Sequence, residues 1–166
     1  MLIAVQRCPK GSFDAIAIKI GMICYTLVSV YGPNEDNPNF YESLEECVDL
    51  LPTENIIMSG DWNFVMDTER DSNYIRENNT NAKTRFIETT RKYMLIDVWR
   101  QLHPHEKQFS WWKPNPRKCL RLDMLLTSDN LLNNMTSCTI EPGYRTDHNI
   151  LDSTFQHPNL ETGPGL

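Results

Sequence analysis

Four short stretches of the sequence carry polar side chains that could do chemistry together: Y-G-P-N, G-D-W-N, an aspartate inside an apolar run, and T-D-H. The residues concerned are Tyr31, Asn34, Asp61, Asn63, Asp123, Asp147 and His148. A histidine can act as acid or base near neutral pH, and a buried aspartate can orient it. Further carboxylates can hold Mg²⁺ through oxygen, and an amide or a tyrosine hydroxyl can donate to a phosphate oxygen. Together these groups are the equipment of metal-assisted phosphodiester hydrolysis.

Each stretch also has a simpler interpretation. Asp61 and Asn63 could make only a turn, and Asp147-His148 could be a surface pair. Asp123 is harder to explain in this way, because it lies within R-L-D-M-L-L and a buried carboxylate costs several kcal/mol unless it is paired. Only if all four stretches meet in space would they make a site.

Strands and helices must position these side chains, and each stretch lies at or just after an expected strand. Alternating and β-branched apolar residues predict strands, and apolar stripes at helical spacing predict helices. We expect strands at 13–20, 23–30, 56–58, 95–98, 109–112, 121–126, 139–140 and 150–155. Helices are expected after Asn37 as cap with Pro38 first, from Asn81 with Phe86, Ile87 and Thr90 inward, and after Ser128 as cap. This mixture predicts an α/β sandwich with sheets inside and helices outside.

The whole chain has the size and composition of one globular domain, with 166 residues, 40% hydrophobic and 23% charged. A net charge of −6 argues against unspecific coating of nucleic acid by the whole surface, but it leaves room for a local basic groove. Five scattered cysteines without a C-x-x-C pair argue against zinc and for reduced thiols. No stretch suits a bilayer span or a signal peptide, so we expect an intracellular protein that does not engage a membrane.

The four stretches, in this order and at this spacing, resemble the endonuclease/exonuclease/phosphatase superfamily, whose fold is DNase I-like. The closer resemblance is to the apurinic-type endonuclease domain of LINE-like (non-LTR) retrotransposons, and L-I-D-V-W-R-Q-L-H-P-H-E-K-Q-F-S-W-W adds to it. It extends from about Phe13 to Phe155. It implies a DNA-nicking endonuclease that uses Mg²⁺ or Mn²⁺, with a domain at 1–156 and a tail at 157–166.

The resemblance also implies a role for each residue. Asp61 would handle the proton of the attacking water or of the leaving oxygen, and Asn63 would orient the water or the phosphate. Tyr31 and His148 would contact the phosphate, with Asp123 as the buried partner of His148. Asp147 would be a metal ligand. Asn34 and Ser110 would bind the substrate.

The early part of the family pattern is missing. Relatives have an asparagine and a metal-binding glutamate on strands that precede this stretch, and neither Gln6 nor Asp14 fits those motifs. We therefore expect a partial two-sheet sandwich that lacks N-terminal strands, with one sheet short and an edge exposed. Loss of a carboxylate ligand would impair the metal site.

A local basic cluster follows Trp111-Trp112. Its members are Lys113, Arg117, Lys118 and Arg121, which could grip DNA phosphates while an aromatic ring contacts a groove. The expected partner is DNA, the expected state is a monomer, and a reverse transcriptase domain would accompany it in a longer polyprotein, with nuclear localisation.

Two alternatives remain open. One is another phosphodiesterase or phosphatase of the superfamily, although K-C-L-R-L-D replaces the W-C-D-R of the phosphatase branch. The other is a non-catalytic remnant or binding module.

Overall fold

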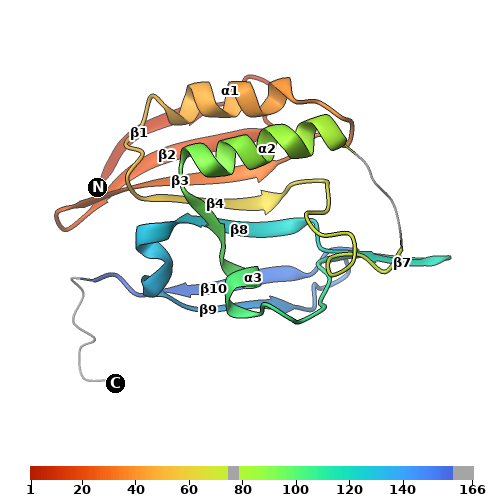
Figure 1. Cartoon of the computed structure of the whole chain (residues 1–166). Helices are drawn as coiled ribbons and strands as arrows, with labels where there is room; N and C mark the ends of the chain where they lie inside the picture. Colours follow the sequence, from red (N-terminus) through yellow and green to blue (C-terminus); the bar gives the residue numbers. More distant parts are fainter. Residues whose placement is uncertain (75–78, 159–166) are drawn as a thin grey trace.

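A six-stranded mixed sheet forms the centre of the molecule (Figure 1). The computed structural model describes residues 1–74 and 79–158. The strands of this sheet lie in the order β1-β2-β3-β4-β8-β5. Their bounds are β1 Leu2–Arg7, β2 Phe13–Ile20, β3 Ile23–Tyr31, β4 Ile56–Asp61, β5 Leu95–Asp97 and β8 Asp123–Ser128. The expected hairpin is confirmed, since β2 and β3 pair antiparallel from Phe13 with Val30 to Ile20 with Ile23.

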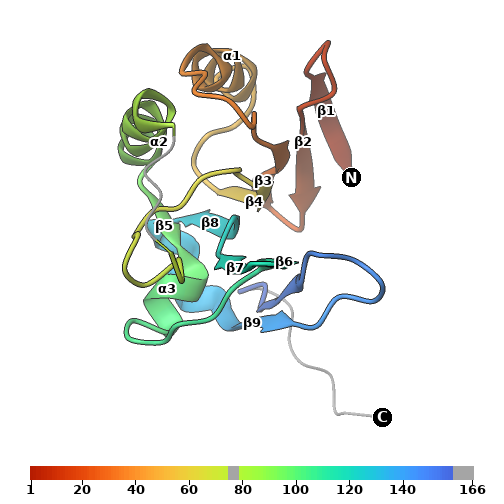
Figure 2. The ribbon, with the colours of Figure 1, turned by 90° about the vertical axis from the view of Figure 1, so that its right-hand side faces the viewer.

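Two helices, α1 (Asn39–Val48) and α2 (Thr80–Lys92), cover one face of this sheet (Figure 2). Beneath them lies an aromatic core in which Tyr41 stacks on Trp62 and Phe86 packs edge-on against both. Alternation in β2 explains how the sheet contributes, because Phe13, Ala15 and Ala17 are buried on this side.

The helix starts differ in detail from the sequence prediction. Pro38, not Asn37, is the N-cap of α1, and no side chain caps that helix. The start of α2 is capped from a distance, because Asp36 accepts the backbone N–H groups of Asn81 and Ala82. Ala82, Phe86 and Thr89 are the buried side of α2, while Ile87 and Thr90, which were expected inward, are half-buried.

The opposite face of the sheet is covered only in part. A second sheet of two strands, β9 (Met135–Glu141) and β10 (Ile150–Phe155), packs there with the short helix α3 (Val98–Leu102). A smaller core of buried residues joins them to β8, namely Val98, Trp99, Leu125, Met135, Cys138 and Ile140. The edge strand β1, which the sequence did not predict, leaves Leu2, Ile3 and Val5 exposed. The expected two-sheet α/β sandwich with outer helices is therefore confirmed.

Several boundaries of the expected strands were wrong, and so was one expected helix cap. Side-chain hydrogen bonds explain one of these boundaries and the cap. The strand at 95–98 ends at Asp97, because its carboxylate accepts the Arg100 N–H and starts α3. Ser128 does not cap the 3₁₀ helix η1 (Asp129–Asn134) with its hydroxyl, which instead accepts the Ile56 N–H. The strand expected at 109–112 is half of a hairpin formed by β6 (Trp111–Pro114) and β7 (Arg117–Leu120).

The ends and the cysteines complete the description. His157, expected to begin the tail, is buried with its ring 5.7 Å from that of Tyr25, and residues 159–166 lie outside the described part of the chain. All five cysteines are free thiols. Within residues 1–74 and 79–158, no helix is long and apolar enough to cross a membrane.

Candidate active site

The ends of three neighbouring strands bring Tyr31, Asp61 and Asp123 side by side. The parallel pair β3–β4 sets Tyr31 against Asp61, and the antiparallel pair β4–β8 sets Asp61 against Asp123. Directly paired residues present their side chains on the same face of a sheet. Three residues that are far apart in the sequence therefore share one end and one face of the sheet.

Two glycines allow the backbones to approach closely at this end. A Cβ on Gly60, whose φ is +152°, would lie 1.8 Å from the Val30 carbonyl oxygen. A Cβ on Gly32 would lie 2.6 Å from the carbonyl oxygen of Trp62. In each of the motifs Y-G-P-N and G-D-W-N, any larger residue in place of the glycine would thus clash with the backbone of a neighbouring segment. Trp62 itself is buried with 1% exposure, which confirms that it packs into the core while Asp61 and Asn63 line the cleft.

Asn63 closes a turn and also faces the cleft. Its φ of +54° is left-handed, a conformation that asparagine tolerates. Its N–H donates to Asp61 Oδ1 at 2.9 Å, and its Nδ2 donates to the Gly32 carbonyl at 2.7 Å. These bonds fix both side chains, and the turn that they make leaves both residues on the cleft.

His148 pairs with Asp123, as expected. Its Nδ1 lies 2.9 Å from Asp123 Oδ2, and its Nε2 lies 3.8 Å from Asp61 Oδ2. The loop that carries it is anchored to β6, because the Trp112 N–H donates to the Asp147 carbonyl and Trp111 forms a β-bridge with His148. The imidazole is thereby held between two carboxylates, with a short gap on the Asp61 side.

Ser110 supports the site from behind and does not face substrate. Its side chain is fully buried, and its hydroxyl oxygen accepts the N–H groups of Leu122 and Asp123, both at 2.9 Å. The expectation that Ser110 binds substrate was therefore wrong. It positions the start of β8, which delivers Asp123 to His148.

Arg121 also has a different place from the one expected. It is 1% exposed and pairs with Asp71 at 2.8 Å and with Asp97 at 2.8 Å, so it does not belong to a DNA-facing basic cluster. The same Asp71 carboxylate accepts Arg100 Nη2 at 2.5 Å. Arg121 lies two residues before Asp123, so this buried network ties the loop around Asp71 to the start of β8.

Burial shifts the protonation of the central carboxylate. The pKa of Asp61 is raised above its ordinary value, first by burial and then by the neighbouring charges of Asp123 and Asp147. The Asn63 N–H and His148 oppose this shift. A carboxylate with a raised pKa, next to a histidine, is a better proton acceptor than an exposed one.

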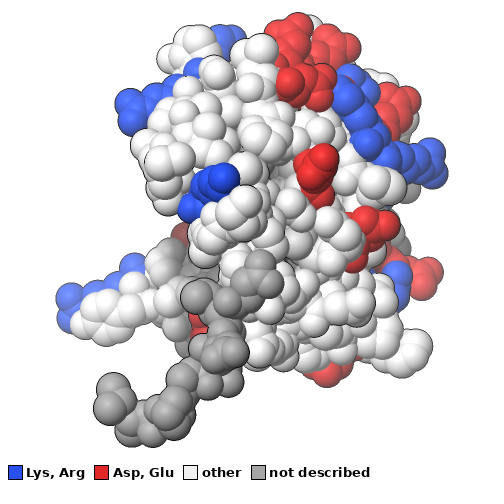
Figure 3. All heavy atoms as spheres, turned by 90° about the vertical axis from the view of Figure 1, so that its left-hand side faces the viewer, with Lys and Arg blue, Asp and Glu red and all other residues white. Residues whose placement is uncertain are grey.

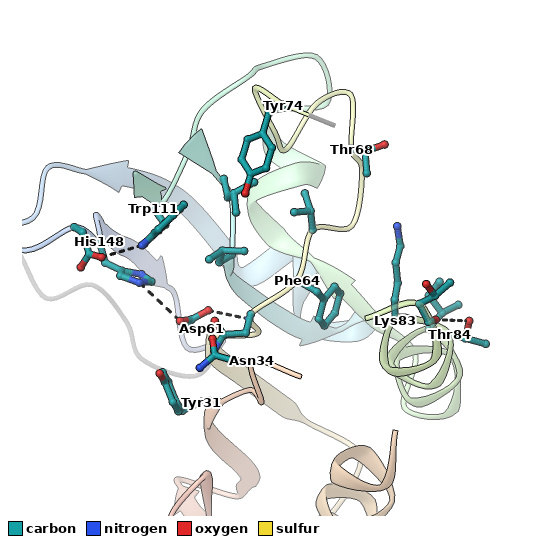
Figure 4. A pocket seen from close by; sticks show the side chains of 17 residues that line it. Tyr31, Asn34, Asp61, Phe64, Thr68, Tyr74, Lys83, Thr84, Trp111 and His148 are labelled. Carbon is teal, nitrogen blue, oxygen red and sulfur yellow. Dashed lines mark hydrogen bonds and ion pairs between the residues drawn. The ribbon is translucent and has the colours of Figure 1, made fainter. Parts of the chain in front are cut away.

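A cleft of about 730 Å³ opens over these groups (Figure 4). Figure 4 shows Asp61 between Asn34 and His148, with Trp111 beside His148. The candidates that line the cleft are Tyr31, Asn34, Asp61, Asn63, Asp147 and His148. Trp111 was not expected to act here, yet its Nε1 donates to Asp147 Oδ2 at 2.9 Å and so orients that carboxylate.

Other lining residues were also missed by the sequence analysis. They include Phe64, Tyr74, Lys83, Thr84, Ile87, Leu120 and Leu122. On α2 a signal was present, because Thr80, Thr84 and Ile87 recur at helical spacing and so share one face. That face lines the cleft, and Ile87 on it also packs against the main core.

The predicted metal ligand remains a prediction. Among residues 1–74 and 79–158, no group of three or more histidine, cysteine, aspartate or glutamate side chains is arranged to hold an ion. Asp61 and Asp147 both line the cleft, and the charge of one raises the pKa of the other. These two are the carboxylates among the described residues that line the cleft.

The basic residues expected at DNA lie on a separate hairpin. Lys113 pairs with Lys118 across β6 and β7, beside Arg117, and in the described part of the chain none of the three makes an ion pair. Trp112 on the same hairpin is 43% exposed. Over the helical layer, by contrast, acidic and basic side chains are mixed (Figure 3). The β6–β7 hairpin is therefore a local concentration of positive charge.

The fold defined by these elements is DNase I-like, and similar solved structures support this assignment. No family model matches the sequence. The AP endonuclease LMAP from Leishmania major aligns with a TM-score of 0.74 at 19% identity, covering 89% of this chain and 55% of that one. The 3'-5' exonuclease NExo from Neisseria meningitidis aligns with a TM-score of 0.74 at 17% identity, covering 94% of this chain and 72% of that one.

A third similar structure is the endonuclease domain of TRAS1, a telomere-specific non-LTR retrotransposon. It aligns with a TM-score of 0.70 at 17% identity, covering 95% of this chain and 70% of that one. The chain thus spans little more than half of LMAP and about seven tenths of the other two. At these identities the likeness establishes the fold, and the resemblance predicted from the motifs is confirmed at that level.

Proposed function

We propose that this chain is a phosphodiester-hydrolysing domain that nicks DNA. The observation that carries the proposal is the row Asp61–His148–Asp123, with separations of 3.8 and 2.9 Å, on strand ends at the mouth of a cleft. The fold is shared with an AP endonuclease, a 3'-5' exonuclease and a retrotransposon endonuclease domain, which supports DNA as the proposed substrate.

The side chains divide the work of cleavage between them. Asp123 accepts the Nδ1 proton of His148, which leaves Nε2 directed at the gap beside Asp61. When protonated, the imidazole donates from Nε2 to a phosphate oxygen and stabilises the charge that develops there. Asp61 takes the proton of the attacking water, a role that its raised pKa favours. Asn63 and Tyr31 orient the phosphate by hydrogen bonds.

A divalent cation, Mg²⁺ or Mn²⁺, belongs to the proposal. Mg²⁺ commonly binds through one or two carboxylates, substrate phosphate and water, and Asp147, which lines the cleft, offers such a carboxylate. When bound, the ion would supply charge neutralisation at the phosphate. Asp147 is held for this purpose by the Trp111 indole N–H.

The β6–β7 hairpin is the proposed DNA grip. Lys113, Arg117 and Lys118 lack acidic partners in the described part of the chain, and Trp112 offers an exposed ring beside them. Such a combination binds phosphates and contacts a groove. By the likeness to the endonuclease domain of TRAS1 we further propose a retrotransposon origin. A reverse transcriptase partner domain, a nuclear site of action and a monomeric state are the other parts of this proposal.

A plasmid-nicking assay with Mg²⁺ tests the proposal. We expect the chain to relax supercoiled plasmid, and we expect His148→Ala and Asp61→Asn each to lower the rate by at least about a hundredfold. His105→Ala is a matched control, since His105 is exposed and does not line the cleft. A rate that His148→Ala leaves unchanged would refute the assignment of the site.

A non-catalytic DNA-binding domain is the second candidate. It is favoured by the absence, among residues 1–74 and 79–158, of a three-ligand metal group. This candidate predicts DNA binding that depends on the β6–β7 hairpin, with no nicking by the unaltered chain. A substrate panel that adds a 3'-phosphorylated duplex and a phospholipid headgroup separates the nuclease from a phosphatase of the same fold.

A further inference from the structure

The cleft continues well beyond the catalytic row. Past Asp61 its floor is apolar, made by Phe64, Val65 and Leu122, and its far wall is the face of α2 that carries Lys83 and Ile87. In Figure 4, Phe64 lies between Asp61 and Lys83, so the lysine stands at the opposite end from His148. No role in the proposed chemistry uses this half of the cleft.

The charge of Lys83 is the second feature of this wall. Its ammonium group makes no ion pair or side-chain hydrogen bond within residues 1–74 and 79–158. Its neighbours differ, because Arg85 pairs with Glu45 and Glu88, and Lys92 pairs with Glu45 and Asp49. Of the described residues that line this wall, Lys83 is therefore the cation whose charge can bind a ligand.

The helix terminus beside Lys83 does not compete for that ligand. The first N–H groups of α2 are already bonded to Asp36, at 3.3 Å for Asn81 and 2.7 Å for Ala82. That carboxylate also cancels the positive end of the helix dipole. Among the described lining residues, the charged group of this wall that can bind an anion is therefore the Lys83 side chain.

We infer that Lys83 binds the phosphate next to the one that is cut, with the intervening nucleotide lying over Phe64 and Leu122. A nucleic acid strand alternates anionic phosphates with flatter, less polar sugar and base, and the cleft offers the same order: His148, an apolar floor, then Lys83. The volume of about 730 Å³ lies within the range of sites that enclose a ligand of this size. The inference rests on the proposed function, because it takes the scissile phosphate to lie at His148.

Equilibrium binding in EDTA tests this without requiring catalysis. The probe is a short fluorescein-labelled DNA duplex, measured by fluorescence anisotropy over a series of salt concentrations. We expect Lys83→Gln to weaken binding by about tenfold, as for one charge-assisted hydrogen bond, and to lower the salt slope by about one. Lys19→Gln is the matched control, since Lys19 lies at the other end of β2 from the strand ends that form the site and should bind as the unaltered chain does.

A methylphosphonate scan locates the contact. Neutral substitution of one phosphate adjacent to the scissile position should weaken binding to the unaltered chain and have no further effect on Lys83→Gln. Equal losses for both proteins at every position, or a Lys83→Gln variant that binds normally, would overturn the inference and leave the proposed nuclease standing. Failure of the unaltered chain to bind the duplex would instead overturn both.

Discussion

Replacement of Asp71 by asparagine removes the acidic centre of the buried network behind the site. Asp71 is 1% exposed and accepts Arg121 Nε at 2.8 Å, Arg121 Nη2 at 3.1 Å and Arg100 Nη2 at 2.5 Å. Asparagine has nearly the same volume, so the substitution removes the charge and leaves the packing. Its effect therefore reports the electrostatic part of the network.

We expect the loss of unfolding free energy in Asp71→Asn to lie near the lower end of the range known for broken buried ion pairs. Removing one partner of a buried ion pair costs about 3–5 kcal/mol, because the other charge stays buried. Here Arg121 keeps Asp97 at 2.8 Å, and Arg100 keeps the carbonyls of His103 at 3.0 Å and Glu106 at 2.8 Å. We expect Asp71→Asn to lower the free energy of unfolding by about 3 kcal/mol, which for a domain of this size lowers Tm by about 6–12 °C.

Urea unfolding followed by tryptophan fluorescence measures this change. Trp99 is buried, with the Arg100 guanidinium 4.8 Å and that of Arg121 5.2 Å from its ring, so its emission reports on the network. Arg70→Ala is the control, because its ion pair with Asp67 is exposed and is worth about 1 kcal/mol or less. An Asp71→Asn midpoint equal to that of Arg70→Ala would refute the reasoning.

Three other substitutions give distinct outcomes. Burial raises the pKa of Asp61, so the folded protein holds this proton more tightly than the unfolded chain, and stability falls as pH rises from the ordinary carboxyl value of 3.8 through the raised one. Asp61→Asn should therefore unfold at a higher urea concentration than the unaltered chain at neutral pH, and this gain should vanish below pH 3.8. A gain at every pH would contradict this reasoning. Gly60→Ala should abolish soluble folded protein, judged by yield and circular dichroism. Gly11→Ala, at a φ of +70° with nothing within 4 Å of the new Cβ, should lower the free energy of unfolding by only about 1 kcal/mol. Equal effects of the two substitutions would exclude the clash with Val30. Ser110→Ala leaves two buried N–H groups unpaired and should lower the free energy of unfolding by about 2 kcal/mol, and an unchanged urea midpoint would show that water replaces the hydroxyl.

Local patterns in the sequence were sufficient for much of the fold. The β2–β3 hairpin, the short apolar strand β4 and the aspartate in an apolar run follow from periodicity and from the cost of burying a carboxylate. The strand β1 was missed, because its exposed edge position lacks a clear alternation of burial. The β6–β7 hairpin was half missed, because its short strands carry mostly charged and exposed residues.

The candidate site was predictable where one motif contains both the glycine that lets the backbones approach and the polar side chains that line the cleft. G-D-W-N carries the glycine that permits close approach and the two polar groups that it presents. Ser110 and Arg121 were misassigned because their roles depend on partners about ten or more residues away, Leu122 and Asp123 for the one, Asp71 and Asp97 for the other. Side-chain type alone cannot tell a buried ion pair from a surface cation. Lys83 was missed because a lone lysine on a helix reads as a solvated residue until the cleft is seen.

The most direct measurement is a crystal structure of the chain with a DNA duplex made resistant to cleavage. A phosphate oxygen of the uncut linkage should lie within hydrogen-bond distance of His148 Nε2, on the cleft side of the 3.8 Å contact between that atom and Asp61 Oδ2, with the His148–Asp123 bond of 2.9 Å intact. DNA bound on another face, or an imidazole turned away from Asp123 in the complex, would contradict the proposed site.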